Sequence, residues 1–332
     1  MIKLSPLRSI PVEEYLLTRI AFSPDGSRIA IGHKRFRTLD AETGASLRDF
    51  SYPEFIGQLR FSPDGRFIAA ANVADNHPAT GGNLTVFDAD SGAVHFAHLS
   101  SRPVEACAFA AQEGPMVAWN VARVESVADQ PAVVGEIARR QLDPLRELPP
   151  LSLRQHEVRA LAASPEGFTC FARQSLGEAI TVEQANLIFR KFRLLGLDTR
   201  GNVLRDFDLG IGAGVSALSP DGKLLAVEMV DFKNNERHVS LIDTETGVEA
   251  NLLALEANTL PVLEFSQDSD YFLCMKEDAE ASFNTLRIWS TADLRLVGEA
   301  QLDLSYHAMT SCLAHSVLAF LGNGKLELFA IE

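Results

Sequence analysis

Long apolar runs are absent from this sequence. No uninterrupted apolar segment among its 332 residues is long enough to span a bilayer. The first residues, Met1 to Arg8, also lack the continuous apolar stretch of an export signal. We therefore expect a cytoplasmic protein that has no membrane partner.

Positive charge is scarce. The chain has 30 Lys and Arg residues against 44 Asp and Glu, which gives a formal net charge of -14. Nucleic acids and anionic lipids are bound mainly through Lys and Arg, so a field of this sign disfavours both. A protein or peptide with a neutral or basic surface remains a suitable partner.

Cysteine is also rare. The four cysteines are far apart in the sequence and show neither Cys-x-x-Cys spacing nor the pattern of a disulfide framework. Each lies in an apolar, strand-like segment. We expect buried, reduced thiols, and the alternative is a single adventitious disulfide. The cysteines are Cys107, Cys170, Cys274 and Cys312.

Motifs for catalysis and ligand binding are missing as well. The sequence has no Gly-x-Ser-x-Gly elbow, no phosphate-binding loop and no dinucleotide fingerprint. Its eight histidines show no ligand spacing with carboxylates or thiols. We expect no catalytic residues, no cofactor and no bound metal, and hence a protein that is not an enzyme.

A repeated motif organises the chain. Phe22 to Gly26 reads Phe-Ser-Pro-Asp-Gly, residues 61–65 repeat it, and 218–222 read Leu-Ser-Pro-Asp-Gly. Weaker copies occupy 163–167 and 265–269, and two eroded copies fall by position near Phe109 and Leu313. The spacing of about 40 to 55 residues matches one four-stranded propeller blade per copy.

The chemistry of this motif predicts a β-hairpin. Proline presets the backbone of a turn, aspartate bonds the backbone two residues on, and glycine adopts a positive φ. Apolar runs flank the motif, as in Arg66 to Ala71, which indicates strands buried on both faces.

A second signature follows each hairpin. Leu84 to Gly92 is an alternating strand closed by an Asp/Ser/Gly turn, and Val239 to Gly247 ends in an Asp/Thr/Gly turn. Related segments end at Gly44, Gly201 and Thr291. Each supplies a third strand and the turn into a fourth.

Together these signatures resemble the WD40 family, in a degenerate Ser-Pro-Asp-Gly form that looks like its prokaryotic members. The resemblance covers nearly the whole chain and implies one domain, residues 1–332. It implies an all-β fold, a seven-bladed β-propeller of four-stranded antiparallel blades. The Gly-His dipeptide is missing and the Trp-Asp ending is replaced, so the hydrogen-bonded tetrad of full-motif relatives is not implied.

The N-terminus is expected to close the ring of blades. The last copy ends with a third strand at 325–331, and no residues follow to supply a fourth. Residues 2–10 precede the first motif by the distance that a fourth strand keeps. We expect them to pair with 325–331, because closure removes exposed strand edges. The alternative is a frayed N-terminus.

Length variation collects between the second and third strands of five blades. In a propeller these connections emerge on the same face as the links between blades, and loops on a rigid scaffold commonly carry binding. The segment 181–192 could form a short helix, which either packs on its own blade or binds a partner. The insertions are 72–83, 120–131, 173–190, 230–238 and 276–284.

Links between blades add candidate contact residues on that face. Tyrosine and arginine are common interface anchors, although loop aromatics also cap their own propeller. We expect a non-catalytic interaction scaffold, a monomer by itself, that binds its partner there. The predicted partner-binding residues are Tyr52, Phe55, Arg102, His156, Tyr306 and His307.

Two other functions are compatible with such a fold. Some propellers, such as lactonases and hydrolases, catalyse reactions at the central channel, which Arg19, Gln58, Glu105 and Arg159 could line. The Ser-Pro-Asp-Gly repeats also resemble periplasmic TolB-like propellers. The absence of an export signal argues against the second alternative.

Overall fold

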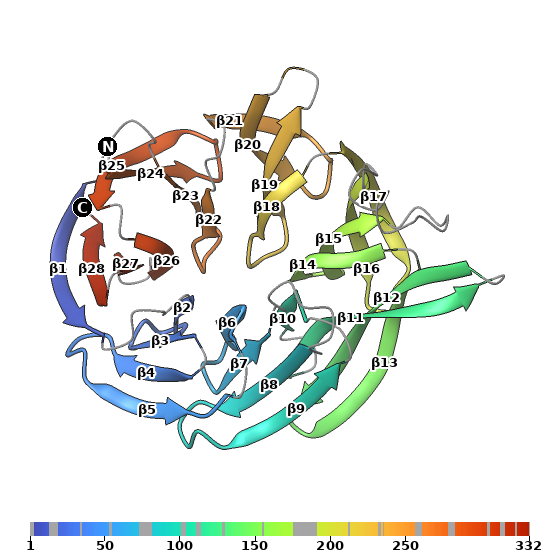
Figure 1. Cartoon of the computed structure of the whole chain (residues 1–332), viewed down its shortest axis with the longest axis horizontal. Helices are drawn as coiled ribbons and strands as arrows, with labels where there is room; N and C mark the ends of the chain where they lie inside the picture. The colour runs from blue at the N-terminus through green and yellow to red at the C-terminus, as the bar shows by residue number, and fades with distance from the viewer. Residues whose placement is uncertain are drawn as a thin grey trace. The chain divides into compact units, whose positions relative to one another are not determined.

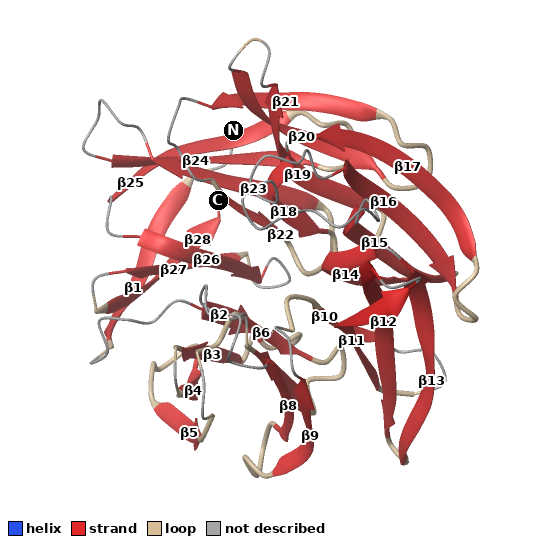
Figure 2. Ribbon diagram, turned by 45° about the vertical axis from the view of Figure 1, so that its right-hand side comes forward, coloured by secondary structure: helices blue, strands red, loops and turns tan. Residues whose placement is uncertain are grey.

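The structure is a computed structural model that describes most of the chain. The described residues are 3–12, 19–33, 35–52, 55–72, 82–100, 104–110, 114–127, 130–154, 156–174, 191–211, 213–231, 234, 236–255, 261–277, 283–303, 306–312, 316–322 and 324–331. Their regular secondary structure is entirely β, as Figure 2 shows. This part of the chain has no helix that could cross a membrane.

The described strands form seven four-stranded antiparallel sheets, which confirms the predicted blades (Figure 1). The chain divides into two compact units. Unit 1 comprises Met1–Asp75, Asn83–His98 and Ala257–Glu332, and unit 2 comprises Asn76–Gly82 and Leu99–Glu256. We number the blades by the order of their motifs.

Unit 1 holds blades one, six and seven and most of blade two. Blade one consists of β2 (Arg19–Phe22), β3 (Arg28–Gly32), β4 (Phe36–Asp40) and β5 (Ser46–Phe50). Blade two consists of β6 (Gln58–Phe61), β7 (Phe67–Ala71), β8 (Gly82–Asp88) and β9 (Val94–Ser100). Blade six consists of β22 (Val262–Phe265), β23 (Tyr271–Glu277), β24 (Phe283–Ser290) and β25 (Leu296–Asp303). Blade seven consists of β26 (Tyr306–Cys312), β27 (Val317–Gly322), β28 (Lys325–Ile331) and β1 (Leu4–Pro11).

Unit 2 holds blades three, four and five. Blade three consists of β10 (Cys107–Ala110), β11 (Met116–Val127), β12 (Gln130–Leu142) and β13 (Leu145–Arg154). Blade four consists of β14 (His156–Ser164), β15 (Gly167–Gln174), β16 (Lys191–Asp198) and β17 (Val203–Ile211). Blade five consists of β18 (Ala213–Leu218), β19 (Leu224–Asp231), β20 (Glu236–Asp243) and β21 (Glu249–Leu255).

The repeated motif folds as its chemistry predicts. In blade one the Ser23 hydroxyl donates to Asp25 (Oγ to Oδ1, 2.6 Å), and the Arg28 N–H donates to Ser23 Oγ (2.9 Å). The donated bond holds the pKa of the Asp25 carboxyl below its usual value. Gly26 has a φ of 67°, in the region that favours glycine. The apolar strand that follows the motif in blade two, β7, is buried on both faces as predicted.

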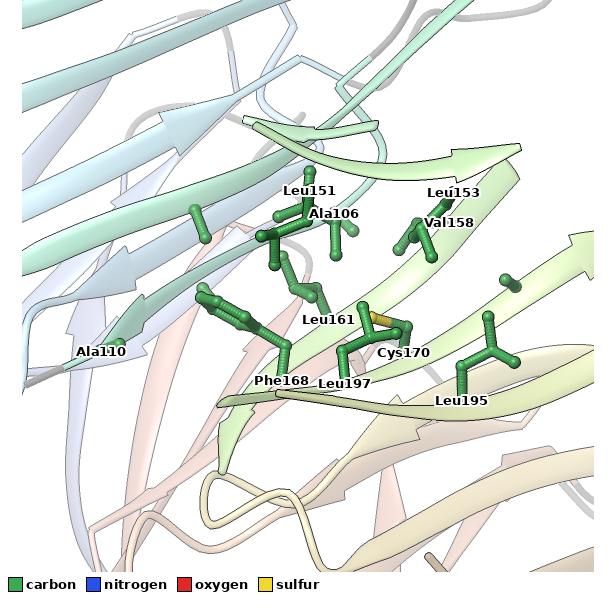
Figure 3. Close-up of a cluster of buried hydrophobic side chains, with 14 of the residues drawn as sticks. Ala106, Ala110, Leu151, Leu153, Val158, Leu161, Phe168, Cys170, Leu195 and Leu197 are labelled. Atoms are coloured by element: carbon green, nitrogen blue, oxygen red, sulfur yellow. The ribbon is translucent and has the colours of Figure 1, made fainter. Parts of the chain in front are cut away.

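Each unit is held together by packing between blades. In unit 1 the first strands β22, β26, β2 and β6 contact one another in that order, and in unit 2 β14 contacts both β10 and β18. In unit 2 a cluster of buried side chains joins blades three and four, and Figure 3 shows Leu151, Leu161, Phe168 and Leu197 within it. Burial of such side chains is the main stabilising contribution to the fold.

The four cysteines are buried and form no disulfide, which confirms the expectation of buried thiols. Cys170 lies in the cluster that joins blades three and four. Burial raises the pKa of the Cys170 thiol, and it raises that of Cys274 to about 12. Thiols in such surroundings are protonated and unreactive at neutral pH.

The N-terminal strand supplies the fourth strand of blade seven, as predicted. Strand β1 pairs antiparallel with β28, and Leu4 lies opposite Ile331 at one end of the pairing. Ile10 lies opposite Leu326 and packs into a core cluster that also contains Phe22 of blade one. The strand therefore completes one blade and packs against the next.

Deleting residues 1–10 should lower the free energy of unfolding by several kcal/mol, because ladder bonds and the burial of Ile10 are lost together. Ile10→Ala alone should cost about 2–4 kcal/mol. Leu7 is 55% exposed on the same strand, so Leu7→Ala should cost less than about 0.5 kcal/mol. Chemical denaturation measures all three, and equal midpoints for the deletion and the full chain would show that β1 is misplaced.

Two glycines allow the cost of a positive φ to be distinguished from the cost of a steric clash. Gly247 has a φ of +70°, and a Cβ there would lie 2.6 Å from the Phe207 ring; Gly210 has a φ of +74° with nothing within 4 Å. Gly210→Ala should therefore cost about 1 kcal/mol, from the positive φ alone. Gly247→Ala should cost about 1–3 kcal/mol more, because the ring must move. Thermal unfolding of the pair tests this, and equal losses would contradict the packing at Gly247.

Candidate functional site

The blades have two different ends, and in the blades described next one end carries the tight turns between the first and second strands and between the third and fourth. In blade five the Thr244 hydroxyl donates to the Gly222 carbonyl (2.7 Å), so the second turn is bonded to the Ser-Pro-Asp-Gly turn. In blade six Thr291 donates likewise to the Ser269 carbonyl (2.7 Å). In blade one the Ala41 N–H donates to the Ser27 carbonyl (2.9 Å). We call this the turn end.

The other end carries the links between blades and the connections from second to third strand. In unit 1 the Ile56 N–H, in the link after blade one, donates to the His33 carbonyl (2.6 Å), which follows β3. The Tyr52 hydroxyl, in the same link, donates to the Asn83 carbonyl in β8 (2.9 Å). We call this the loop end, and the two families of connection meet there as the sequence predicts.

Most of the predicted insertions lie largely outside the described residues. This holds for the central parts of 72–83, 173–190 and 276–284, and for residues 181–190 of the helix considered at 181–192. The last two residues of that segment, Lys191 and Phe192, lie in β16 and are strand, not helix. The insertion at 120–131 is different. It is a β-hairpin, since β11 and β12 stay paired from Met116 and Gln141 to Val127 and Gln130.

Two of the predicted contact residues are buried in their own blades. Tyr52 is 3% exposed within a core cluster of blades one and two. Tyr306 is 8% exposed on β26, its ring 5.5 Å from that of Phe320, and its carbonyl accepts a bond from Asn284 Nδ2 (3.1 Å). Both tyrosines therefore pack against other side chains of the propeller itself. Little of either ring is left for a partner to contact.

The other predicted contacts differ in what the structure shows of them. Phe55 is partly exposed, and its ring meets that of His33 edge-on with centroids 4.5 Å apart. His156 is partly exposed at the start of β14, where it pairs with Gln174. Arg102 lies outside the described residues, and of His307 only the backbone, in β26, is described. Binding by these four residues stays a prediction.

The loop end of unit 2 carries ion pairs that the sequence did not predict. Glu157 of β14 is bonded to Arg173, at the end of β15. Glu228 of β19, which is 3% exposed, is bonded to Arg237 of β20 and also accepts a bond from the Val215 N–H (3.3 Å). Removal of one partner would leave a partly buried charge unpaired, which is strongly destabilising. These pairs therefore fix the strand ends that border the undescribed connections.

The residues proposed for a catalytic channel are engaged in contacts of their own. Arg159 is bonded to Glu105 (Nη1 to Oε2, 2.6 Å) within unit 2. In unit 1 Arg19 donates to the Gly57 carbonyl. Gln58 lies at the start of β6, partly buried.

A carboxyl group on a first strand was missed at the sequence level. Glu264 lies on β22 between the buried Leu263 and Phe265, and desolvation raises its pKa to about 7 although the charge of Arg60 opposes the shift. A carboxyl with a pKa near neutrality is a candidate for acid–base chemistry. Its signal in the sequence was one acidic residue alternating with the apolar residues of a short strand.

The described residues contain no group of three or more His, Cys, Asp or Glu side chains that could hold a metal ion. What the described loop ends offer is a partly exposed aromatic contact in unit 1 and tightly paired charges in unit 2.

Comparisons with solved structures show the fold. The β-propeller domain of Cps50 (Swd1) from Myceliophteria thermophila matches with a TM-score of 0.65 and 15% identity, over 99% of this chain and 100% of that one. The fold is a seven-bladed β-propeller. Hydrazine synthase from Kuenenia stuttgartiensis matches with a TM-score of 0.67 and 14% identity, over 96% of each chain. At these identities the likeness concerns the fold alone.

No family model and no curated protein matches this chain. The second structure is named as an enzyme, so this propeller fold is found in an enzyme as well as in the Swd1 domain. Function therefore has to be argued from the surface of this chain.

The raised pKa of Glu264 gives a pH-dependent stability with a definite sign. The unfolded chain ionises this carboxyl near 4.5, and the folded propeller does so at about 7. The stabilisation is complete below about pH 4.5 and is lost as the pH rises through about 7. Relative to Glu264→Gln, the wild type should lose up to about 3 kcal/mol over this range. Urea unfolding at several pH values measures the difference, and parallel profiles would contradict the raised pKa.

Proposed function

We propose that this propeller is a non-catalytic interaction scaffold that binds a protein or peptide partner at the loop ends of its blades. The observation that carries the proposal is the asymmetry of the blades. Their tight turns are bonded to each other at one end, whereas β7, β15 and β23 run into predicted insertions at the other. Variable connections on a rigid scaffold are where binding usually evolves. The similarity to the Swd1 propeller is consistent with this proposal.

The residues proposed to contact the partner follow from exposure. Phe55 has accessible surface and a ring fixed by His33, so it would lose little freedom on binding. His156 has accessible surface at the loop end of unit 2. Arg102 and His307 are included because the sequence predicts them as contacts. Tyr52 and Tyr306 serve as supports for these surfaces, because their side chains are buried.

The chemistry of the partner is constrained by charge. The net charge of -14 favours a neutral or basic partner over an acidic one. Among the described carboxylates of unit 2, Glu105, Glu157 and Glu228 are each bonded to an arginine. We therefore expect the charge to act mainly on the rate of association, with binding that weakens as salt rises.

A second candidate function is catalysis at the first strands. It rests on Glu264, whose raised pKa suits a proton donor or acceptor, and on the existence of an enzyme with this fold. Glu264→Gln separates the two proposals, since it should abolish such a reaction and leave partner binding unchanged.

Capture of a partner from the native lysate tests the scaffold proposal through matched variants. Phe55→Ala together with Arg102→Ala should weaken binding by about 2 kcal/mol or more, if these residues are central anchors. Asp64→Ala and Asp221→Ala, in turn-end motifs, should lower stability and leave affinity unchanged. Calorimetric titration gives the affinities. Loss of binding in the turn-end variants, with the loop-end variant unaffected, would place the partner on the opposite end.

A further inference from the structure

One edge of the hairpin of blade three is paired with no described strand over part of its length. Strand β10 pairs with β11 only from Met116 to Trp119, and one more bond runs from the Asn120 N–H to the Ala106 carbonyl (3.0 Å). Beyond Asn120, β11 continues to Val127 and pairs with β12 alone. Figure 1 shows this hairpin extending past the other strands of its blade. The described part of the chain supplies no strand to the outer edge of β11.

The direction of the backbone groups along this edge follows from the pairing. The Asn120 N–H points away from β12, and the β11–β12 register runs without a shift. Because backbone groups alternate between the two sides of a strand, those of Ala122, Val124 and Ser126 also point to the open side. A row of backbone groups that no described strand bonds is a template for another strand.

The edge of β12 is protected where that of β11 is not. Strand β13 pairs with β12 as far as Val134. Just beyond it, Pro131 lies opposite Ser126, so its nitrogen faces the open side of β12 and offers no N–H. Proline is one of the devices that prevent pairing at a sheet edge. Strand β11 carries no proline, and none of the described strands covers its edge beyond Asn120.

We propose that this edge is a dimerisation site, at which β11 pairs antiparallel with β11 of a second copy about a two-fold axis at Val124. This register opposes Val124 to itself and Ala122 to Ser126 of the second copy. These are the residues whose backbone groups point outward, and they would form about six hydrogen bonds. A two-fold axis makes the contact isologous, as in most homodimers.

Charge complementarity selects a second copy as the occupant. The same register places Arg123 opposite Glu125 of the second copy, and Glu125 opposite its Arg123. Both are non-hydrogen-bonded pairs, in which opposed residues lie closest, and opposite charges there stabilise pairing. An unrelated strand would have to supply the same charges at the same spacing. Composition and motifs alone led to the expectation of a monomer, and the geometry of β11 argues for self-association.

Charge reversal tests the register. Arg123→Glu and Glu125→Arg should each weaken self-association at least about tenfold, because each puts like charges opposite one another twice. An equimolar mixture of the two variants should form a heterodimer, since the charges are then complementary again. The double variant should dimerise like the wild type. Sedimentation velocity at low salt distinguishes one chain of 36.2 kDa from a dimer.

Two proline substitutions test the pairing edge without changing any charge. Val124→Pro removes an outward N–H at the centre of the pairing and should abolish the dimer. Val133→Pro, opposite Val124 on β12, removes an outward N–H from the other edge and should leave the dimer intact. A wild type that stays monomeric at several hundred micromolar would overturn the proposal. So would a mixture of the charge variants that does not associate, or equal effects of the two prolines.

Discussion

The fold depends on a buried serine that closes the first hairpin of a blade. Ser23, Ser62, Ser219 and Ser266 are all fully buried. Each hydroxyl donates to an aspartate two residues on and accepts the N–H five residues on, at 2.9 Å in every copy. A buried hydroxyl without partners would be costly, so these bonds make one turn geometry strongly preferred. The turn after the third strand is hydrogen-bonded to this first turn, which fixes the turn end of the blade. The connections at the loop end can then vary in length and sequence.

The sequence predicts the architecture well because local chemistry repeats. The motif tolerates loss of its glycine: Ser269 takes the glycine's place in blade six and adopts a φ of 66°. Leu294 does the same in the second turn, with a φ of 56°. The eroded blades could therefore be placed by spacing, and the N-terminal strand by counting which strand lacked a partner. Each of these inferences needed only the spacing of the repeats and the residues of their turns.

The candidate site was harder to predict, because burial in a link depends on neighbours that no local pattern reveals. Tyrosine is a common interface anchor, yet the Tyr52 hydroxyl donates a hydrogen bond to the Asn83 carbonyl of the next blade. The segment 120–131 was predicted only as an insertion between the second and third strands of its blade. In the structure its described residues extend β11 and β12 as a paired hairpin, whose register runs without a shift. Glu264 was overlooked because a charge in a four-residue strand leaves too short a pattern to interpret.

The central claim is that function resides at the loop ends while the turn ends serve stability. Hydrogen exchange of the free and partner-bound protein tests this most directly, because it reports backbone protection along the whole chain. The account predicts that binding slows exchange in the links and insertions, among them the segment around Phe55, and leaves the turn-end amides of Arg28, Phe67 and Leu224 unchanged. New protection concentrated at those turn-end amides, with the links unaffected, would contradict it.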